Sequence, residues 1–170
     1  MSPNHLVFKG NQRRGLKMRF EDARVRRLWS QQFIPVVVRQ GSSEPILVRL
    51  PYADDNRTWL RGDHRNQPTW NSDAKYWSVP KSWFDDVVHR ALIRYGKAYV
   101  IQLYKRQQTC APACWNAKGF HCECSCLGAH HGNGHPSGAW FMVSDTFAFN
   151  WGDTEYACRL ITAINESLHV

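Results

Sequence analysis

The sequence predicts an α+β fold in which two main helices pack on a mostly antiparallel sheet and a Cys/His-rich loop binds a metal. Three observations lead to this prediction. Short β-branched runs alternate with turn residues, two segments carry apolar residues at helical spacing, and cysteine and histidine are concentrated in one stretch. The chain has 170 residues, the length of one domain. We expect a basic N-terminal arm at 1–30 and a single domain at 31–170, with its zinc-binding segment at 110–135.

The first half of the chain predicts two pairs of strands. Residues 34–39 (IPVVVR) are rich in β-branched side chains, and residues 46–50 form the returning strand after a turn that contains Gly, Ser and Pro. Residues 68–80 predict two short strands around an Asn-Ser-Asp turn. Both pairs are typical of antiparallel hairpins.

Further strands are expected in the second half. Residues 98–104 (AYVIQLY) predict one strand. Residues 139–144 and 146–151 predict two strands, or one bent strand.

The clearest predicted helix covers residues 83–95. Its apolar stripe consists of Phe84, Val87, Val88, Ala91, Leu92 and Tyr95. Ser82 is the expected N-cap, with Asp85 three residues later, and Gly96 is the expected C-terminal stop. We expect Val88 and Leu92 to be buried.

Three more helical segments are expected. Residues 20–29 predict a short helix and residues 55–61 a helical turn. Residues 155–168 predict the second main helix, from the spacing of Tyr156, Leu160, Ile161, Ile164 and Leu168. Cys158 would lie on this helix as a buried apolar residue.

The positive charge is concentrated near the N-terminus. The formal net charge is +8, and residues 1–30 contain eight Lys and Arg against Glu21 and Asp22. Such a segment attracts phosphate backbones or anionic surfaces. The alternative is a solvated tail that keeps the protein soluble. The candidate phosphate contacts are Arg13, Arg14, Arg24, Arg26 and Arg27.

The sequence shows neither an apolar leader nor a run long enough to cross a membrane. We therefore expect a cytoplasmic protein without membrane contact, in which thiols stay reduced. Cysteines in that setting indicate metal binding rather than disulfides.

Five of the six cysteines fall within residues 110–126, which strengthens the metal interpretation. Zinc needs four thiolate or imidazole ligands near tetrahedral geometry. The candidate ligands are Cys110, Cys114, Cys122, Cys124, Cys126, His130 and His131. Which four bind is open, and an iron–sulfur cluster is the alternative cofactor. Free thiols, or disulfides formed after isolation, are the alternatives without metal.

The cluster does not resemble a hydrolytic metal site. It contains no H-E-x-x-H motif and no deaminase pattern, and its surplus of thiolates favours a closed structural site. We therefore expect a non-enzymatic protein, with a metal-dependent hydrolase as an alternative.

Aromatic and basic residues interleave across residues 52–84. Single strands of nucleic acid are bound by such mixtures, because bases stack on rings while cations hold phosphates. The candidate binding residues here are Trp59, Arg61, Trp70, Lys75 and Trp77. The alternative is a purely structural role, in which most of these rings belong to the core. A phage- or plasmid-type inhibitor or adaptor, with the rings against a protein partner, is the rival function to DNA or RNA binding.

Part of this region resembles a known family. The residues Leu50-Pro51-Tyr52, the stretch PTWNSDAKYWSVP at 68–80 and the helix that follows resemble the HARP domain of annealing helicases, mainly through Asp73, Lys75 and Trp77. The resemblance covers about residues 34–104 and implies DNA binding. The Cys-rich segment resembles a set of bacterial and mobile-element proteins with a CAPACWNA signature, which implies no mechanism. The chain is too short to include a helicase motor.

Overall fold

The computed structural model describes residues 19–41, 43–105, 119–120 and 141–164. Its elements, in chain order, are α1 (Ala23–Ser30), β1 (Val36–Arg39), β2 (Ile46–Arg49), α2 (Asn56–Arg61), β3 (Thr69–Asn71), β4 (Tyr76–Val79), a 3-10 turn (Lys81–Trp83), α3 (Phe84–Tyr95), β5 (Lys97–Leu103), β6 (Phe141–Trp151) and β7 (Thr154–Ala163).

The described strands form one seven-stranded sheet in the order β3-β4-β2-β1-β5-β7-β6. Each neighbouring pair is antiparallel except β1 and β5, which run parallel. The predicted α+β class with a mostly antiparallel sheet is therefore confirmed. Both predicted hairpins are also confirmed, as β1–β2 and β3–β4. A parallel pair needs a crossover, and here the chain between β1 and β5 carries α3 over the sheet.

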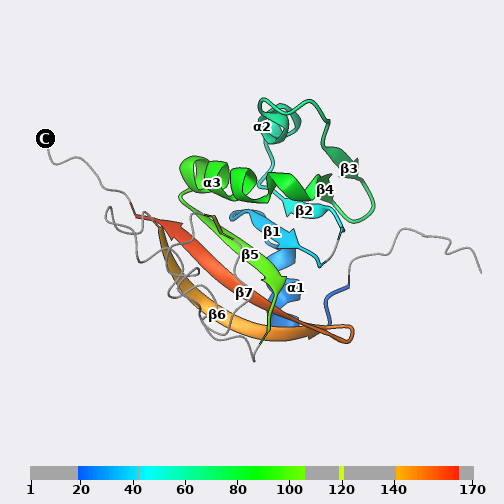
Figure 1. Cartoon of the computed structure of the whole chain (residues 1–170), viewed down its shortest axis with the longest axis vertical. Helices are drawn as coiled ribbons and strands as arrows, with labels where there is room; N and C mark the ends of the chain where they lie inside the picture. Colours follow the sequence, from blue (N-terminus) through cyan, green and yellow to red (C-terminus); the bar gives the residue numbers. More distant parts are fainter. Residues whose placement is uncertain (1–18, 42, 106–118, 121–140, 165–170) are drawn as a thin grey trace, which may run out of the picture.

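Helices cover both faces of the sheet, with α3 on one side and α1 on the other (Figure 1). The run Val36-Val37-Val38 contains no polar residue because both faces of β1 are buried. Val37 packs into the core beneath α3, whereas Val36 and Val38 pack beneath α1. A strand that is buried on both faces reads as a continuous apolar run.

The helix predicted at residues 20–29 is confirmed as α1, and it belongs to the folded body. Asp22 caps it by accepting hydrogen bonds from the backbone N–H groups of Arg24 and Val25. Val25 and Trp29 are buried on the sheet, and the ring of Phe20 lies 4.7 Å from that of Trp151. Part of the basic segment is thus displayed by a helix docked on the sheet.

The predicted central helix is confirmed as α3, with Val88 and Leu92 buried. Gly96 ends it in the left-handed region, at φ 75°. The predicted cap at Ser82 is wrong. Because the chain enters α3 through the 3-10 turn, Trp83 precedes the first α-helical residue, and Ser82 lies inside the turn without capping α3.

The helix predicted at residues 155–168 is also wrong, because the described part of this segment forms β7, which lies between β5 and β6. The described residues therefore contain one long helix, α3, and two short ones, α1 and α2, rather than the two main helices that were predicted. Cys158 is buried, as expected, but on a strand. Residues 141–151 form one strand whose register shifts between Ser144 and Phe147, in agreement with one bent strand.

Candidate nucleic-acid interface

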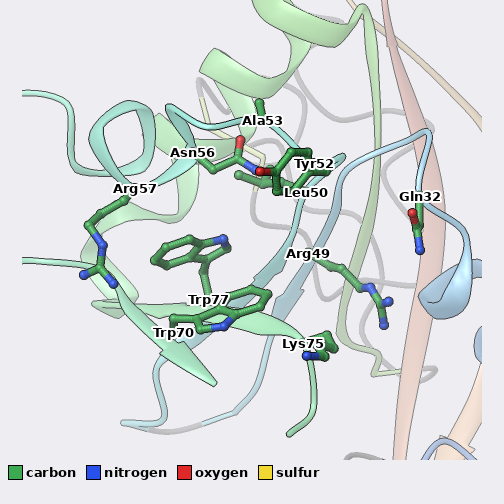
Figure 2. Close-up of a pocket in the computed structure, with 10 residues that line it drawn as sticks. All are labelled: Gln32, Arg49, Leu50, Tyr52, Ala53, Asn56, Arg57, Trp70, Lys75 and Trp77. Atoms are coloured by element: carbon green, nitrogen blue, oxygen red, sulfur yellow. The ribbon is translucent and has the colours of Figure 1, made fainter. Parts of the chain in front are cut away.

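A cleft of about 560 Å³ opens where β2 ends beside the β3–β4 hairpin and the start of α2 (Figure 2). Its walls come from segments that are far apart in the sequence. The lining residues are Gln32, Arg49, Leu50, Tyr52, Ala53, Asn56, Arg57, Trp70, Lys75 and Trp77.

The β3–β4 hairpin positions two indole rings in this cleft. The Asn71 side chain accepts hydrogen bonds from the backbone N–H groups of Asp73 (3.1 Å) and Ala74 (2.9 Å), which fixes the turn. Trp70 and Trp77 are then paired across the two strands, with ring centroids 5.0 Å apart. Trp77 packs against the core beneath α3, whereas Trp70 is 41% exposed. Trp70 therefore offers a ring face to a ligand.

The cleft is positively charged. Arg49, Arg57 and Lys75 line it, and none of its ten lining residues is acidic. Within the described part of the chain, no carboxylate forms an ion pair with any of the three cations. Figure 2 shows the rings of Trp70 and Trp77 between Arg57 on one side and Arg49 and Lys75 on the other. Such a surface attracts anions.

Two of these cations are held in place by neighbouring rings. The guanidinium of Arg57 lies 5.1 Å from the Trp77 ring centroid and donates a hydrogen bond to the carbonyl of Pro68. The guanidinium of Arg49 lies 5.7 Å from the Trp29 ring centroid, and burial lowers the pKa of Arg49. These positions are preorganised rather than freely mobile.

Asn56 adds a polar group to the wall of the cleft. Its side chain is buried, and its Nδ2 donates to the carbonyl of Pro51 at 2.9 Å. Its Oδ1 accepts no hydrogen bond from the residues that the structure describes. Because this oxygen is itself buried, Asn56 contributes to the wall of the cleft through its packing rather than as an accessible acceptor.

One strongly exposed ring lines the cleft, and a second exposed ring follows the lining residue Gln32 in the sequence. Tyr52 is 87% exposed, and its hydroxyl donates to Asp54 at 2.7 Å, which raises the pKa of Tyr52. Phe33, next to Gln32, is 86% exposed. Tyr52 therefore gives the cleft a second solvent-accessible ring beside Trp70.

The structure brings Trp70, Lys75 and Trp77 together in the cleft, but it places two other candidates elsewhere. Trp59 packs on Tyr95 at 6.0 Å beside α3. Arg61 is exposed at the end of α2, where its Nε donates to the carbonyl of His64.

Three of the candidate arginines of the basic segment, Arg24, Arg26 and Arg27, lie on α1. Arg24 and Arg27 line a second cleft of about 360 Å³. Arg24 forms an ion pair with Asp22 at 2.7 Å, which lowers the pKa of Asp22 to about 2. Arg26 donates to the backbone carbonyls of Phe20 and Glu21. Arg13 and Arg14 lie outside the described residues.

The candidate zinc ligands Cys110, Cys114, Cys122, Cys124, Cys126, His130 and His131 also lie outside the described residues. In the described ranges, no group of three or more His, Cys, Asp or Glu side chains is arranged to hold a metal ion. Cys158 is a free cysteine, and burial raises the pKa of its thiol to about 12. Such a thiol does not ionise at neutral pH and is chemically inert.

Two residues within the Cys/His-rich segment are described, and both lie beside Asp85 of α3. The backbone N–H of Phe120 donates to the Asp85 carboxylate at 2.6 Å, and its carbonyl accepts from Arg159. The Phe120 ring is buried 5.1 Å from that of Phe141. Gly119 fits because a Cβ there would lie 2.7 Å from an Asp85 oxygen. Residues 119–120 are therefore attached to α3 and β7.

Sequence reasoning missed Arg49 and Asn56 as members of the cleft. Arg49 ends an otherwise buried strand, and a cation at such a place is a signal that could have been used. Asn56 carries no comparable signal, because its role depends on where α2 packs.

No protein family model, no curated protein and no solved structure matches this chain. Among the described helices, none combines the length and the apolar character that a bilayer-crossing helix requires.

Proposed function

We propose that this protein binds single-stranded nucleic acid in the cleft formed by β2, α2 and the β3–β4 hairpin, without catalysing a reaction. The observation that carries the proposal is the combination of three cations without a carboxylate partner and a partly exposed Trp70 in one cleft. Phosphates are attracted by the cations, and a base can stack on the ring. The resemblance to HARP domains, which bind DNA, supports the same function.

The exposed ring of Trp70 favours an unpaired strand over a duplex. Stacking on Trp70 requires a base whose face is free, and bases in a duplex are covered by their neighbours. The rival protein-binding function would use the same rings, but it gives no reason for three cations in the cleft.

The salt dependence of binding tests this proposal. Arg49, Arg57 and Lys75 are the expected phosphate contacts, and each contact to a single strand contributes about −0.7 to the slope of log K against log salt. Lys75→Gln should flatten the slope by about that amount for all sequences. Fluorescence anisotropy with a labelled oligothymidine measures it.

The matched control is Arg61→Gln, which removes an exposed cation outside the cleft. It should leave the slope within error of the wild type. Equal effects of the two substitutions, or no binding by the wild type at low salt, would contradict the proposal. The protein-binding function would then be the better account.

We also propose that the segment at 110–135 holds zinc through thiolates, and that the protein works in the cytoplasm, where thiols stay reduced. The concentration of cysteines supports the first part. We expect about one zinc per chain in native mass spectrometry, and a lower melting temperature after chelation, since ligation is coupled to folding. A metal-free protein with free thiols and an unchanged melting temperature would argue against zinc.

A further inference from the structure

We propose that a single strand bound in the first cleft continues along α1 into the second cleft, so that the binding site extends beyond the cleft itself. This inference rests on the proposed function and concerns the length of strand that the protein covers. The second cleft is lined by Arg24, Arg27, Leu28, Tyr99, Asp145, Thr146 and Phe147.

Strand register places the two clefts along one row of the sheet. Arg49 in the first cleft is paired with Val36, and Val36 is paired with Tyr99 in the second cleft. Tyr99 is paired in turn with Leu160, and Leu160 with Ser144. Residues that are paired across neighbouring strands share a face, so this row lies on the α1 side. From Arg49 to Ser144 it crosses four strand spacings, or about 19 Å.

Helix α1 connects the same two places. Near its start, Arg24 donates to the carbonyl of Ala148 on β6, and its guanidinium lies 4.2 Å from the Phe147 ring centroid. Near its end, the Trp29 ring lies 6.1 Å from that of Tyr76 on β4. The helix therefore crosses the sheet from β6 towards β4. Gln32, just beyond its end, lines the first cleft, whereas Leu28 lines the second.

The chemistry of the second cleft suits the same ligand, though less strongly. Arg27 is exposed, and its side chain has no partner among the described residues. Tyr99 is partly exposed and offers a ring beside the cation. The carboxylate of Asp145, which also lines this cleft, repels an anion. Asp145 lies at the strand irregularity with φ 46° and is exposed. We infer a supporting contact to phosphate rather than a second independent site.

A length series of oligothymidines tests the inference. A distance of about 19 Å corresponds to roughly six nucleotides of a stacked strand at about 3.4 Å per nucleotide. Trinucleotides should therefore occupy the first cleft alone, whereas oligomers on the order of twelve nucleotides should reach both clefts. Longer oligomers offer more overlapping binding positions, which raises their apparent affinity. The affinity of each variant is therefore compared with that of the wild type at the same length.

Two substitutions make the test specific, because one removes a positive charge and the other a negative charge from the second cleft. Arg27→Gln should weaken the longer oligomers about threefold to tenfold and leave trinucleotides unchanged. Asp145→Asn should strengthen only the longer oligomers, and Asn tolerates the positive φ at this position. Arg65→Gln, an exposed cation that lines neither cleft, is the matched control and should change neither length.

The outcomes separate this inference from the proposed function. If trinucleotides and longer oligomers respond alike to Arg27→Gln and Asp145→Asn, or neither responds, the extension is wrong while binding in the first cleft stands. If wild-type protein binds no oligomer of any length, the proposed function itself fails and the extension fails with it.

Discussion

Replacing Phe120 with alanine is expected to lower the free energy of unfolding by about 3–5 kcal/mol. The Phe120 side chain is 3% exposed and packs in the core cluster beneath α3, next to Phe141. Its removal would leave a cavity that the two neighbouring elements can fill only in part. Urea unfolding followed by tryptophan fluorescence measures the change.

The control for this substitution is Ile93→Ala on α3. Ile93 is 70% exposed, so its truncation should change the free energy of unfolding by no more than about 0.5 kcal/mol. Equal effects of Phe120→Ala and Ile93→Ala would show that Phe120 does not belong to the core. The result also bears on the metal proposal, because Phe120 lies between Cys114 and Cys122 in the sequence and attaches that segment to the fold.

Replacing Trp70 with alanine is expected to weaken single-strand binding by roughly 5- to 150-fold, the equivalent of about 1–3 kcal/mol for one stacked base. The reason is that Trp70 presents the partly exposed indole of the cleft, while Trp77 beneath it is packed against the core. Affinity for a duplex should fall less, since its bases cannot stack on the ring. Anisotropy titrations with matched single-stranded and double-stranded oligonucleotides give both values.

Trp70→Phe is the conservative control, because it keeps an aromatic face and should restore most of the lost affinity. Melting curves of both variants show whether the β3–β4 hairpin is retained. An equal loss for single strands and duplex would mean that Trp70 contributes only to general attraction. Unchanged affinity in the alanine variant would show that no base stacks on Trp70.

Local patterns were sufficient to predict most of the described fold. The β-branched run before Gly41 predicted β1, and the apolar stripe that ends at Gly96 predicted α3. The C-terminal segment shows where such patterns fail. Residues 156–161 are almost continuously buried, because β7 lies between β5 and β6 with both faces covered. That arrangement removes the alternation that marks a strand, and the remaining apolar spacing also fits a helix.

The cleft could be predicted only in part, for a related reason. Trp70, Lys75 and Trp77 belong to one hairpin, so their interleaving is visible along the sequence. Arg49 and Asn56 join them only because β2 pairs with β4 and α2 packs nearby, and no local pattern encodes that pairing. The docking of α1, which carries part of the basic segment, likewise depends on the burial of Val25 and Trp29 against the sheet.

Photo-crosslinking tests the central claim most directly, because it reports both binding and position. An oligothymidine carrying 5-iodouracil, which crosslinks to nearby aromatic side chains on irradiation, is bound to the wild-type protein at low salt and mapped by mass spectrometry. We expect the crosslinked peptides to contain Trp70 or Tyr52, the exposed rings that line the cleft. Crosslinks confined to peptides outside the cleft, or a complete absence of bound oligonucleotide, would contradict the assignment of this surface to nucleic acid.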